Sequence, residues 1–327
     1  MDSAQEKPSV MACIYGKPKK KKTSDTLASF PTALFIGVPS AITLVAQNEL
    51  GFTPAVHADP PKTLPELVNL LRYLGDNNLV EPYGAVVIDD ASHLAKRSML
   101  EWKETAPVGR SGKKDRFWAY QQLDRYLLEL SAYSRHLGCH LAMTFHERAP
   151  GSNIDGFFCP GGPDVPSRNQ TETIPSWCDI NVRAMIDPGY PDPWFPGVYF
   201  CDPTDGDWVC GDRTGVCTAR TPGNLREILR ASESDYRLDR LPGLEWQDDV
   251  AEAVAVAIAS GVDARTAVTE IAASVGDFNH LHLRWACQDG IARGVLRLSR
   301  QRGLFDFDGA EAPTETSAAV PPPPPAK

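Results

Sequence analysis

The sequence predicts an α/β fold in which short buried strands alternate with helices. Three observations lead to this prediction. Short apolar runs recur along the first two thirds of the chain, as is typical of strands that are buried on both faces. Segments with the apolar spacing of helices lie between these runs. The first run, at residues 10–15, leads through a glycine and a lysine-rich loop into the start of a helix.

Residues 16–23 form a nearly complete phosphate-binding motif, a P-loop. The octet GKPKKKKT matches G-x-x-x-x-G-K-[ST] at every fixed position except the sixth, where Lys21 replaces glycine. In this motif, backbone N–H groups surround the β- and γ-phosphates, the lysine adds positive charge, and the next hydroxyl holds Mg²⁺. The motif therefore predicts ATP and Mg²⁺ as cofactors. The predicted binding residues are Gly16, Lys17, Pro18, Lys19, Lys20, Lys21, Lys22, Thr23 and Ser24, with Thr23 as a ligand of Mg²⁺.

The lysine at position 21 leaves two interpretations open. If the sixth position needs a left-handed backbone, a residue other than glycine costs about 1–2 kcal/mol there. A loss of that size would weaken nucleotide binding roughly 5- to 30-fold. The alternative is that the run KPKKKK at 17–22 is a solvated basic segment, a nuclear-targeting signal or a nucleic-acid patch.

A later apolar strand, at 83–90, ends in two carboxylates. In P-loop enzymes such a strand is expected beside the P-loop strand, and its terminal aspartate holds Mg²⁺, usually through water. Asp89 is predicted to take that role. Asp90 either polarises the attacking water or caps the helix predicted over 91–100.

The other strands and helices of the first two thirds of the chain are predicted from apolar runs and from signals at helix ends. Thr63 before a helix and Gly75 after it are examples of such signals. The stretch from Arg148 to Trp177 is rich in glycine and proline, and we expect a loop excursion there. Further strands are predicted at 33–37, 139–145, 179–186 and 198–201, and helices at 24–29, 63–75, 116–137 and 223–231.

Composition narrows the class of protein. A net charge of −9 argues against a protein coated in positive charge for duplex DNA. The 8 cysteines include no C-x-x-C pair, so neither a zinc ribbon nor a disulfide framework is predicted, and Cys13 and Cys139 should be small core residues. A reduced, cytoplasmic setting fits best. Because no long apolar window occurs, we expect a soluble, non-secreted protein without a membrane partner.

The sequence of the C-terminal third predicts a separate, smaller helical domain. Helices are expected at 248–260, 264–275 and 280–302, and the arginine-rich third helix either contacts DNA or a neighbouring subunit or has a solvated face. The tail contains five consecutive prolines at 321–325 and should be disordered. The predicted organisation is a flexible N-terminus at 1–9, a main domain at 10–237, a small helical domain at 247–305 and a disordered tail at 309–327.

Taken in order, the motifs carry a resemblance to a known family. They read IYGKPKKKKTSD, FPTALFIG, YGAVVIDDASHLA, GCHLAMTFHERAP, a GGPDVPS loop and DWVCGDRTGV. The chain resembles phage-encoded, RecA-like P-loop NTPases over roughly residues 10–230, and some of these accompany single-strand annealing and recombination systems. The resemblance implies a RecA-like αβα core with a mainly parallel sheet and nucleotide at the carboxyl ends of the strands. It also implies rings or filaments, single-stranded DNA and phage recombination proteins as partners, and the cytoplasm of an infected bacterium.

The resemblance also implies roles for particular residues. Thr144 and His146 become candidate sensors of the γ-phosphate, although an ordinary strand-end histidine is the alternative. Arg213, in the DRTG turn, is the candidate that reaches a neighbouring subunit's γ-phosphate. The chain departs from the family at Lys21 and at Gly37-Val38-Pro39, where the family often carries a catalytic glutamate. The general base is therefore unassigned, with Asp90 as a substitute.

Three functional hypotheses follow. The first is a Mg·ATP-dependent NTPase that acts on phage DNA during recombination or replication, with Asp90, His146 and Arg213 in catalytic roles. The second is a catalytically degenerate P-loop protein that serves as a DNA-binding or virion-associated assembly component. The third makes the lysine run a nucleic-acid or targeting patch without any nucleotide, and it predicts salt-sensitive binding.

Overall fold

The computed structural model describes residues 9–50, 53–109, 112–153, 155–186, 197–202, 206–223, 225, 228–229, 296–298 and 307–309. The chain divides into two compact units, residues 1–245 and 246–327, which we describe separately. Residues 1–8 of the predicted N-terminal segment, the helices predicted at 248–260 and 264–275, and the tail after Gly309 lie outside the described residues. Among the described residues, no helix combines the length and apolar character that a membrane crossing requires.

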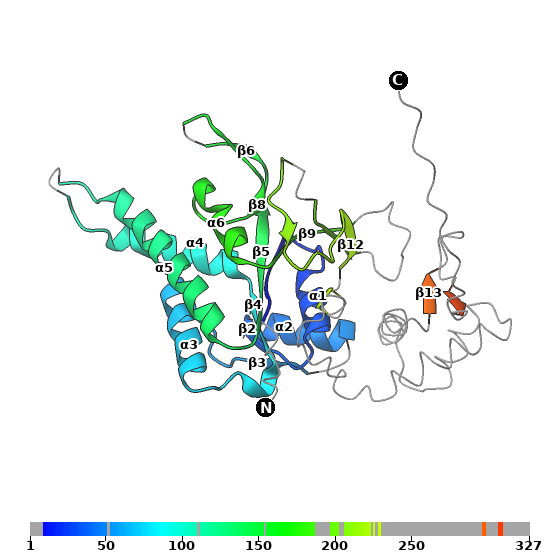
Figure 1. Ribbon diagram of the computed structural model, residues 1–327. Helices are drawn as coiled ribbons and strands as arrows, with labels where there is room; N and C mark the ends of the chain where they lie inside the picture. Colours follow the sequence, from blue (N-terminus) through cyan, green and yellow to red (C-terminus); the bar gives the residue numbers. More distant parts are fainter. Residues whose placement is uncertain are drawn as a thin grey trace, which may run out of the picture. The chain divides into compact units, whose positions relative to one another are not determined.

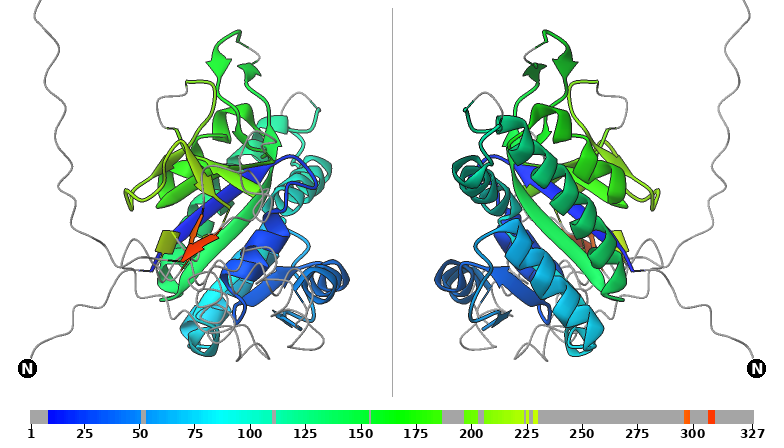
Figure 2. Two further views of the ribbon diagram at one scale, coloured as in Figure 1. Left: turned by 90° about the vertical axis from the view of Figure 1, so that its right-hand side faces the viewer. Right: turned by 90° about the vertical axis from the view of Figure 1, so that its left-hand side faces the viewer.

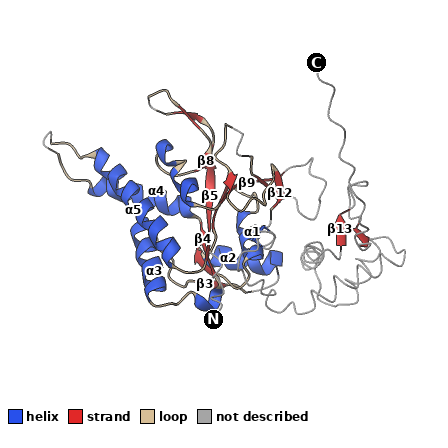
Figure 3. Cartoon of the chain, viewed as in Figure 1, coloured by secondary structure: helices blue, strands red, loops and turns tan. Residues whose placement is uncertain are grey.

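A mainly parallel sheet forms the centre of the first unit, as Figures 1 and 3 show. Its main path runs β12-β10-β9-β1-β5-β4-β2-β3, and the neighbours from β9 to β3 pair in parallel. The α/β class with a mainly parallel sheet is thereby confirmed, and it is consistent with a RecA-like core. The described strands of this sheet are β1 (Met11–Gly16), β2 (Leu34–Gly37), β3 (Ala55–Val56), β4 (Ala85–Asp89), β5 (His140–Arg148), β8 (Gly162–Pro163), β9 (Ile180–Ile186), β10 (Gly197–Phe200), β11 (Gly211–Asp212) and β12 (Arg220–Pro222).

One predicted neighbour relation is wrong. The strand that ends in Asp89 was expected beside the P-loop strand, but β5 lies between β1 and β4. The register pairs Gly16 of β1 with His146 of β5, and Ile88 of β4 with Met143 of β5. Residues 140–145 of β5 are buried, as a central strand requires. This order brings the tip of β5 between the P-loop and the aspartates of β4.

Helices cover both faces of the sheet. Figure 1 shows α3, α4 and α5 on one side of the sheet and α1 and α2 on the other. Thr63 accepts a hydrogen bond from the N–H of Glu66 and begins α3, while Asp115 caps α5 in the same way through Phe117 and Trp118. The helical segments are α1 (Lys22–Ser29), α2 (Pro39–Val45), η1 (Ala46–Leu50), α3 (Leu64–Asp76), η2 (Glu81–Tyr83), α4 (Ala91–Thr105), α5 (Arg116–His136), η3 (Arg168–Gln170) and α6 (Thr173–Trp177).

Buried apolar side chains of the strands and of α3, α4 and α5 form the core. Cys13 and Cys139 belong to it, as predicted. The helix predicted at 223–231 is described only in part, where Leu225, Ile228 and Leu229 are helical and buried.

The excursion at 148–177 contains more structure than the predicted loop. It forms a hairpin of β6 (Gly151–Ser152) and β7 (Phe158–Cys159), then β8 and α6. Because β8 pairs with β5, the central strand continues through Glu147 and Arg148. These strands are two residues long, so they show no apolar alternation that the sequence could reveal.

In the second unit, the described residues form β13 (Leu296–Leu298) and β14 (Phe307–Gly309), which pair antiparallel. The prediction of a helix over 280–302 is therefore wrong at 296–298, because these residues take extended backbone to pair with β14.

Candidate nucleotide-binding site

The P-loop connects β1 to α1 at the carboxyl edge of the parallel strands. Gly16 ends β1 beside β9, where an added Cβ would lie 2.5 Å from the carbonyl oxygen of Ala184, so only glycine fits. The helix begins at Lys22, two residues before its predicted start. The positive end of its macrodipole thus faces the loop, which is the arrangement that binds phosphate.

Lys21, the residue that replaces the motif's glycine, has a left-handed backbone. Its φ is 65°, and that of Lys19 is 62°. The conformation on which the sequence argument depended is therefore present. Since the fold itself holds Lys21 in this region, the cost of about 1–2 kcal/mol falls on folding stability. Affinity for phosphate then depends only on whether the Lys21 side chain obstructs or attracts it.

We therefore expect Lys21→Gly to raise the free energy of unfolding by about 1 kcal/mol, after subtracting the entropy that glycine adds to the unfolded chain. The dissociation constant of Mg·ATP should change by less than about 3-fold, equivalent to about 0.6 kcal/mol. Denaturant unfolding and nucleotide titration measure the two quantities on the same protein. A tenfold gain in affinity would instead mean that the Lys21 side chain obstructs the phosphates.

The side chain of Lys22 is buried and folds back across the loop. Its Nζ donates hydrogen bonds to the carbonyl oxygens of Gly16 at 2.9 Å and Lys17 at 3.0 Å. Burial lowers the pKa of Lys22, and the surrounding carboxylates, led by Asp90 and Asp89, oppose that shift. The loop thus holds a cation at its centre, in the position of the motif's lysine.

Asp89 and Thr23 lie together, as the sequence predicts. Thr23 Oγ1 donates to Asp89 Oδ2 at 3.0 Å, and Thr144 Oγ1 donates to Asp89 Oδ1. Burial raises the pKa of Asp89, and the hydrogen bonds from Thr144 and Thr23 oppose the shift. Hydroxyl and carboxylate oxygens are ligands that Mg²⁺ prefers, so this donor set fits the predicted metal.

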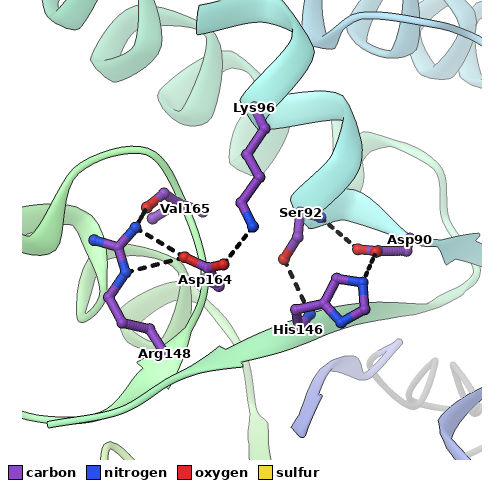
Figure 4. A network of polar contacts seen from close by, with 7 residues as sticks. All are labelled: Asp90, Ser92, Lys96, His146, Arg148, Asp164 and Val165. Atoms are coloured by element: carbon purple, nitrogen blue, oxygen red, sulfur yellow. Dashed lines mark hydrogen bonds and ion pairs between the residues drawn. The ribbon is translucent and has the colours of Figure 1, made fainter. Parts of the chain in front are cut away.

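Asp90 and His146 form a second polar contact, which Figure 4 shows. Asp90 Oδ1 accepts from the backbone N–H of Ser92 at 2.7 Å and caps α4, so the predicted capping role is present. Asp90 Oδ2 lies 2.8 Å from His146 Nε2, and the backbone N–H of His146 donates to Ser92 Oγ at 3.0 Å. The sequence predicted both residues separately, and the structure brings them into contact.

Arg213 lies apart from these residues. Its Nη2 donates to the carbonyl oxygen of Ser176 at 2.9 Å, and its Nη1 is 3.6 Å from Asp179 Oδ1. Asp179 also accepts from the N–H of Met11, at the end of β1 opposite to the P-loop. Arg213 therefore does not join the site of its own chain, and its role toward a neighbouring subunit stays a prediction.

Sequence reasoning missed one ion pair near the loop. The Glu147 side chain is 6% exposed and pairs with Arg183 through Nε at 3.0 Å and Nη2 at 3.2 Å. Lys17 Nζ lies 4.0 Å from the same carboxylate. The Arg183 guanidinium also lies 3.4 Å from the ring centroid of Trp208. The only signal for Glu147 is its position directly after His146, at a strand tip.

Comparisons with known proteins leave the family open. No family model matches the chain, and no curated protein matches it. Among solved structures, the chain is similar to the crystal structure of the RadB recombinase, with 14% sequence identity and a TM-score of 0.34. That similarity covers 56% of this chain and 77% of the other. The functional interpretation therefore depends on the geometry of the site.

Proposed function

We propose that this protein binds Mg·ATP at the P-loop and hydrolyses it while acting on DNA in recombination or replication, in phage as the family resemblance implies. The observation that carries the proposal is the meeting of Thr23 with Asp89 beside the buried Lys22. These residues come from positions 22–23 and 89 of the sequence, yet their functional groups converge at one edge of the sheet. A solvated basic segment would not need that convergence.

The roles follow from the groups present. Backbone N–H groups of the loop would hold the β- and γ-phosphates by donating hydrogen bonds at the N-terminus of a helix. The ammonium of Lys22 would add a positive charge beside the same phosphates. Thr23 and Asp89 would hold Mg²⁺, which supplies neutralisation of phosphate charge when bound. Catalysis would then depend on positioning and on charge stabilisation.

The DNA part of the proposal is supported by the β6–β7 hairpin, which Figures 1 and 2 show projecting beyond the end of β5. Its tip exposes two adjacent aromatic side chains, Phe157 at 70% and Phe158 at 56%. Asn153 Oδ1 accepts from the N–H groups of Asp155 and Phe157, which fixes the turn. Exposed aromatic rings on a fixed turn offer stacking surfaces for unpaired bases.

Polar contacts join the segments on either side of the hairpin to α4 and to the strand that carries His146, and Figure 4 shows these contacts. Asp164, directly after β8, accepts from Arg148 through Nε at 3.0 Å and Nη2 at 2.8 Å, and it pairs with Lys96 of α4. Its backbone N–H donates to the carbonyl oxygen of His146 at 2.8 Å. Single-stranded DNA bound at the hairpin can thus affect the position of His146 through these contacts.

Replacing both Phe157 and Phe158 with alanine is expected to weaken binding of single-stranded DNA at least 10-fold, since base stacking contributes about 1–3 kcal/mol per base. Mg·ATP affinity should stay unchanged. Fluorescence anisotropy with a labelled oligonucleotide measures the effect. Tyr73→Ala is the matched control, because Tyr73 is also an exposed aromatic residue, at 59%, but lies on α3. Equal binding by the double variant and the wild type would exclude the hairpin as a DNA contact.

One observation favours the degenerate alternative, in which the chain is a DNA-binding or virion-associated assembly component. At Gly37, the tip of β2, an added Cβ would lie 1.9 Å from the carbonyl oxygen of Asp89. No glutamate can stand there, so the family's usual base is excluded at this position. Hydrolysis of Mg·ATP by purified protein, assayed with and without single-stranded DNA, decides between the two functions. Turnover that DNA stimulates supports the enzyme, and absence of turnover supports the assembly component.

A further inference from the structure

We propose that His146, oriented by Asp90, accepts the proton of the water that attacks the γ-phosphate. This inference rests on the proposed function and assigns its missing general base. It changes the two roles that the sequence suggested, because Asp90 becomes a positioning residue and His146 becomes the catalytic one.

The hydrogen bonds of Asp90 define the state of the histidine ring. Oδ1 of Asp90 accepts from the N–H of Ser92, and Oδ2 faces His146 Nε2 at 2.8 Å. A carboxylate oxygen accepts hydrogen bonds, so this contact selects the tautomer of the neutral ring that carries its proton on Nε2. Nδ1 then keeps its lone pair and can accept a proton. A carboxylate behind the ring also stabilises the imidazolium that forms.

The backbone of His146 is fixed on both sides. Its N–H donates to Ser92 Oγ at 3.0 Å, and its carbonyl oxygen accepts from the N–H of Asp164 at 2.8 Å. The side chain is nevertheless 41% exposed, so water can reach the ring. A fixed backbone with an accessible ring nitrogen is what a general base needs before substrate arrives.

His146 lies level with the end of the P-loop strand. His146 is the register partner of Gly16, the first residue of the P-loop. Thr144, two residues earlier and therefore on the same face of β5, donates to Asp89 of the Mg²⁺ site. The base candidate thus lies next to both groups that would hold the γ-phosphate.

Three carboxylates near the ring, those of Asp89, Asp90 and Glu147, already have other partners. Asp89 accepts from two threonine hydroxyls. Asp90 uses both oxygens, on Ser92 and His146. Glu147 is bound on two sides by Arg183. Taking a proton would cost each of them an existing interaction, whereas no hydrogen bond to His146 Nδ1 occurs among the described residues.

The step balances without a further reactant. The water oxygen forms a bond to the γ-phosphorus, and the bond from that phosphorus to the bridging oxygen breaks, with the electron pair leaving on ADP. One proton of the water moves to Nδ1 of His146. The imidazolium then releases this proton to phosphate or solvent, which restores the neutral ring.

The test compares His146→Ala, His146→Gln and Asp90→Asn with the wild type. Loss of the base should lower kcat about 100- to 10,000-fold, while the dissociation constant of Mg·ATP stays within about 3-fold. Imidazole added to His146→Ala should restore turnover, because it can occupy the space of the ring. Asp90→Asn should lower kcat in the wild type but have no further effect in the His146→Ala background. Asp115→Asn is the control, since Asp115 also caps a helix but lies at α5.

A second readout needs no turnover. Nitrogen NMR of the ring, assigned by loss of the signal in His146→Gln, should show the Nε2–H tautomer, and Asp90→Asn should mix the tautomers. Full turnover by His146→Gln, failure of imidazole rescue, or an Nδ1–H tautomer would overturn the proposal while ATP hydrolysis by the wild type stands. Failure of the wild type to bind Mg·ATP would overturn the proposed function, and this inference with it.

Discussion

Lys22→Ala is expected to abolish binding of Mg·ATP at micromolar concentrations while the fold stays intact. An ammonium has three N–H donors, and Lys22 uses two of them on the carbonyl oxygens of Gly16 and Lys17. The third is left for a phosphate oxygen. A hydrogen bond from a charged group contributes about 1.5–3 kcal/mol, and alanine also removes the charge, so we expect at least about 100-fold weaker binding.

Calorimetric titration of Mg·ATP measures this effect, and circular dichroism confirms the fold. Lys19→Ala is the matched control. It removes the same charge from an exposed position of the same loop, where the backbone rather than the side chain is expected to contact phosphate. Its affinity should fall by less than about 3-fold. Wild-type affinity in Lys22→Ala would exclude the proposed function, and equal losses in both variants would mean that the loop acts only through its total charge.

Most of the central strands could be predicted from the sequence because parallel strands buried on both faces are continuous apolar runs. β1, β2, β4 and β5 begin within about two residues of their predicted starts. The order of the strands could not be predicted in this way. β4 and β5 are both short apolar runs that end in polar residues, so nothing in either run says which one lies beside β1. Chain connectivity and packing decide that order.

Other elements were missed because their local signals are weak. The helix α2 was not predicted, although Pro39 lies in its first turn. Only Ile42 of its residues is buried, so its sequence lacks the periodic apolar face by which the other helices were predicted. The hairpin β6–β7 depends on the side chain of Asn153 and on pairing between two-residue strands. Such contacts become visible only when the chain is folded.

In the candidate site, too, the residues with local sequence signals could be predicted, and the contacts that depend on the fold could not. Lys22, Thr23 and Asp89 could be predicted because a motif fixes the spacing of the first two and a strand end fixes the third. The pair of Glu147 and Arg183 could not, since the partners are 36 residues apart and come from strands that β1 separates. Asp90 and His146 were each predicted, but their contact depends on the strand order that local patterns do not carry.

Asp89→Asn is expected to change function and stability in opposite directions. Asparagine keeps the shape of Asp89 and one acceptor oxygen, and the hydroxyls of Thr23 and Thr144 can rotate to accept from its amide. It removes the negative charge that would hold Mg²⁺. Charge stabilisation by a metal ion contributes several kcal/mol to the transition state, so turnover should fall about 1000-fold.

The stability effect follows from the pKa of Asp89. Burial raises this pKa, so the folded protein binds the proton more tightly than the unfolded chain does. Stability is therefore lost as the pH rises from about 3.9, the usual value for aspartate, through the raised value. At a pH above both values the charged carboxylate opposes folding, and asparagine removes that cost. In the absence of Mg²⁺, the variant should thus melt at the same temperature as the wild type or higher, and its stability should vary less with pH.

Thermal unfolding from pH 4 to 8, with and without Mg·ATP, measures both halves of this prediction. Mg·ATP should raise the melting temperature of the wild type and leave that of Asp89→Asn unchanged, because a ligand stabilises only the state that binds it. Asp59→Asn provides the control, since Asp59 is an exposed aspartate near the end of β3. A variant that melts well below the wild type without Mg²⁺ would mean that the Asp89 carboxylate supports the fold. Asp89 would then be a structural residue. It would not be a metal-binding residue whose charge lowers the stability of the fold.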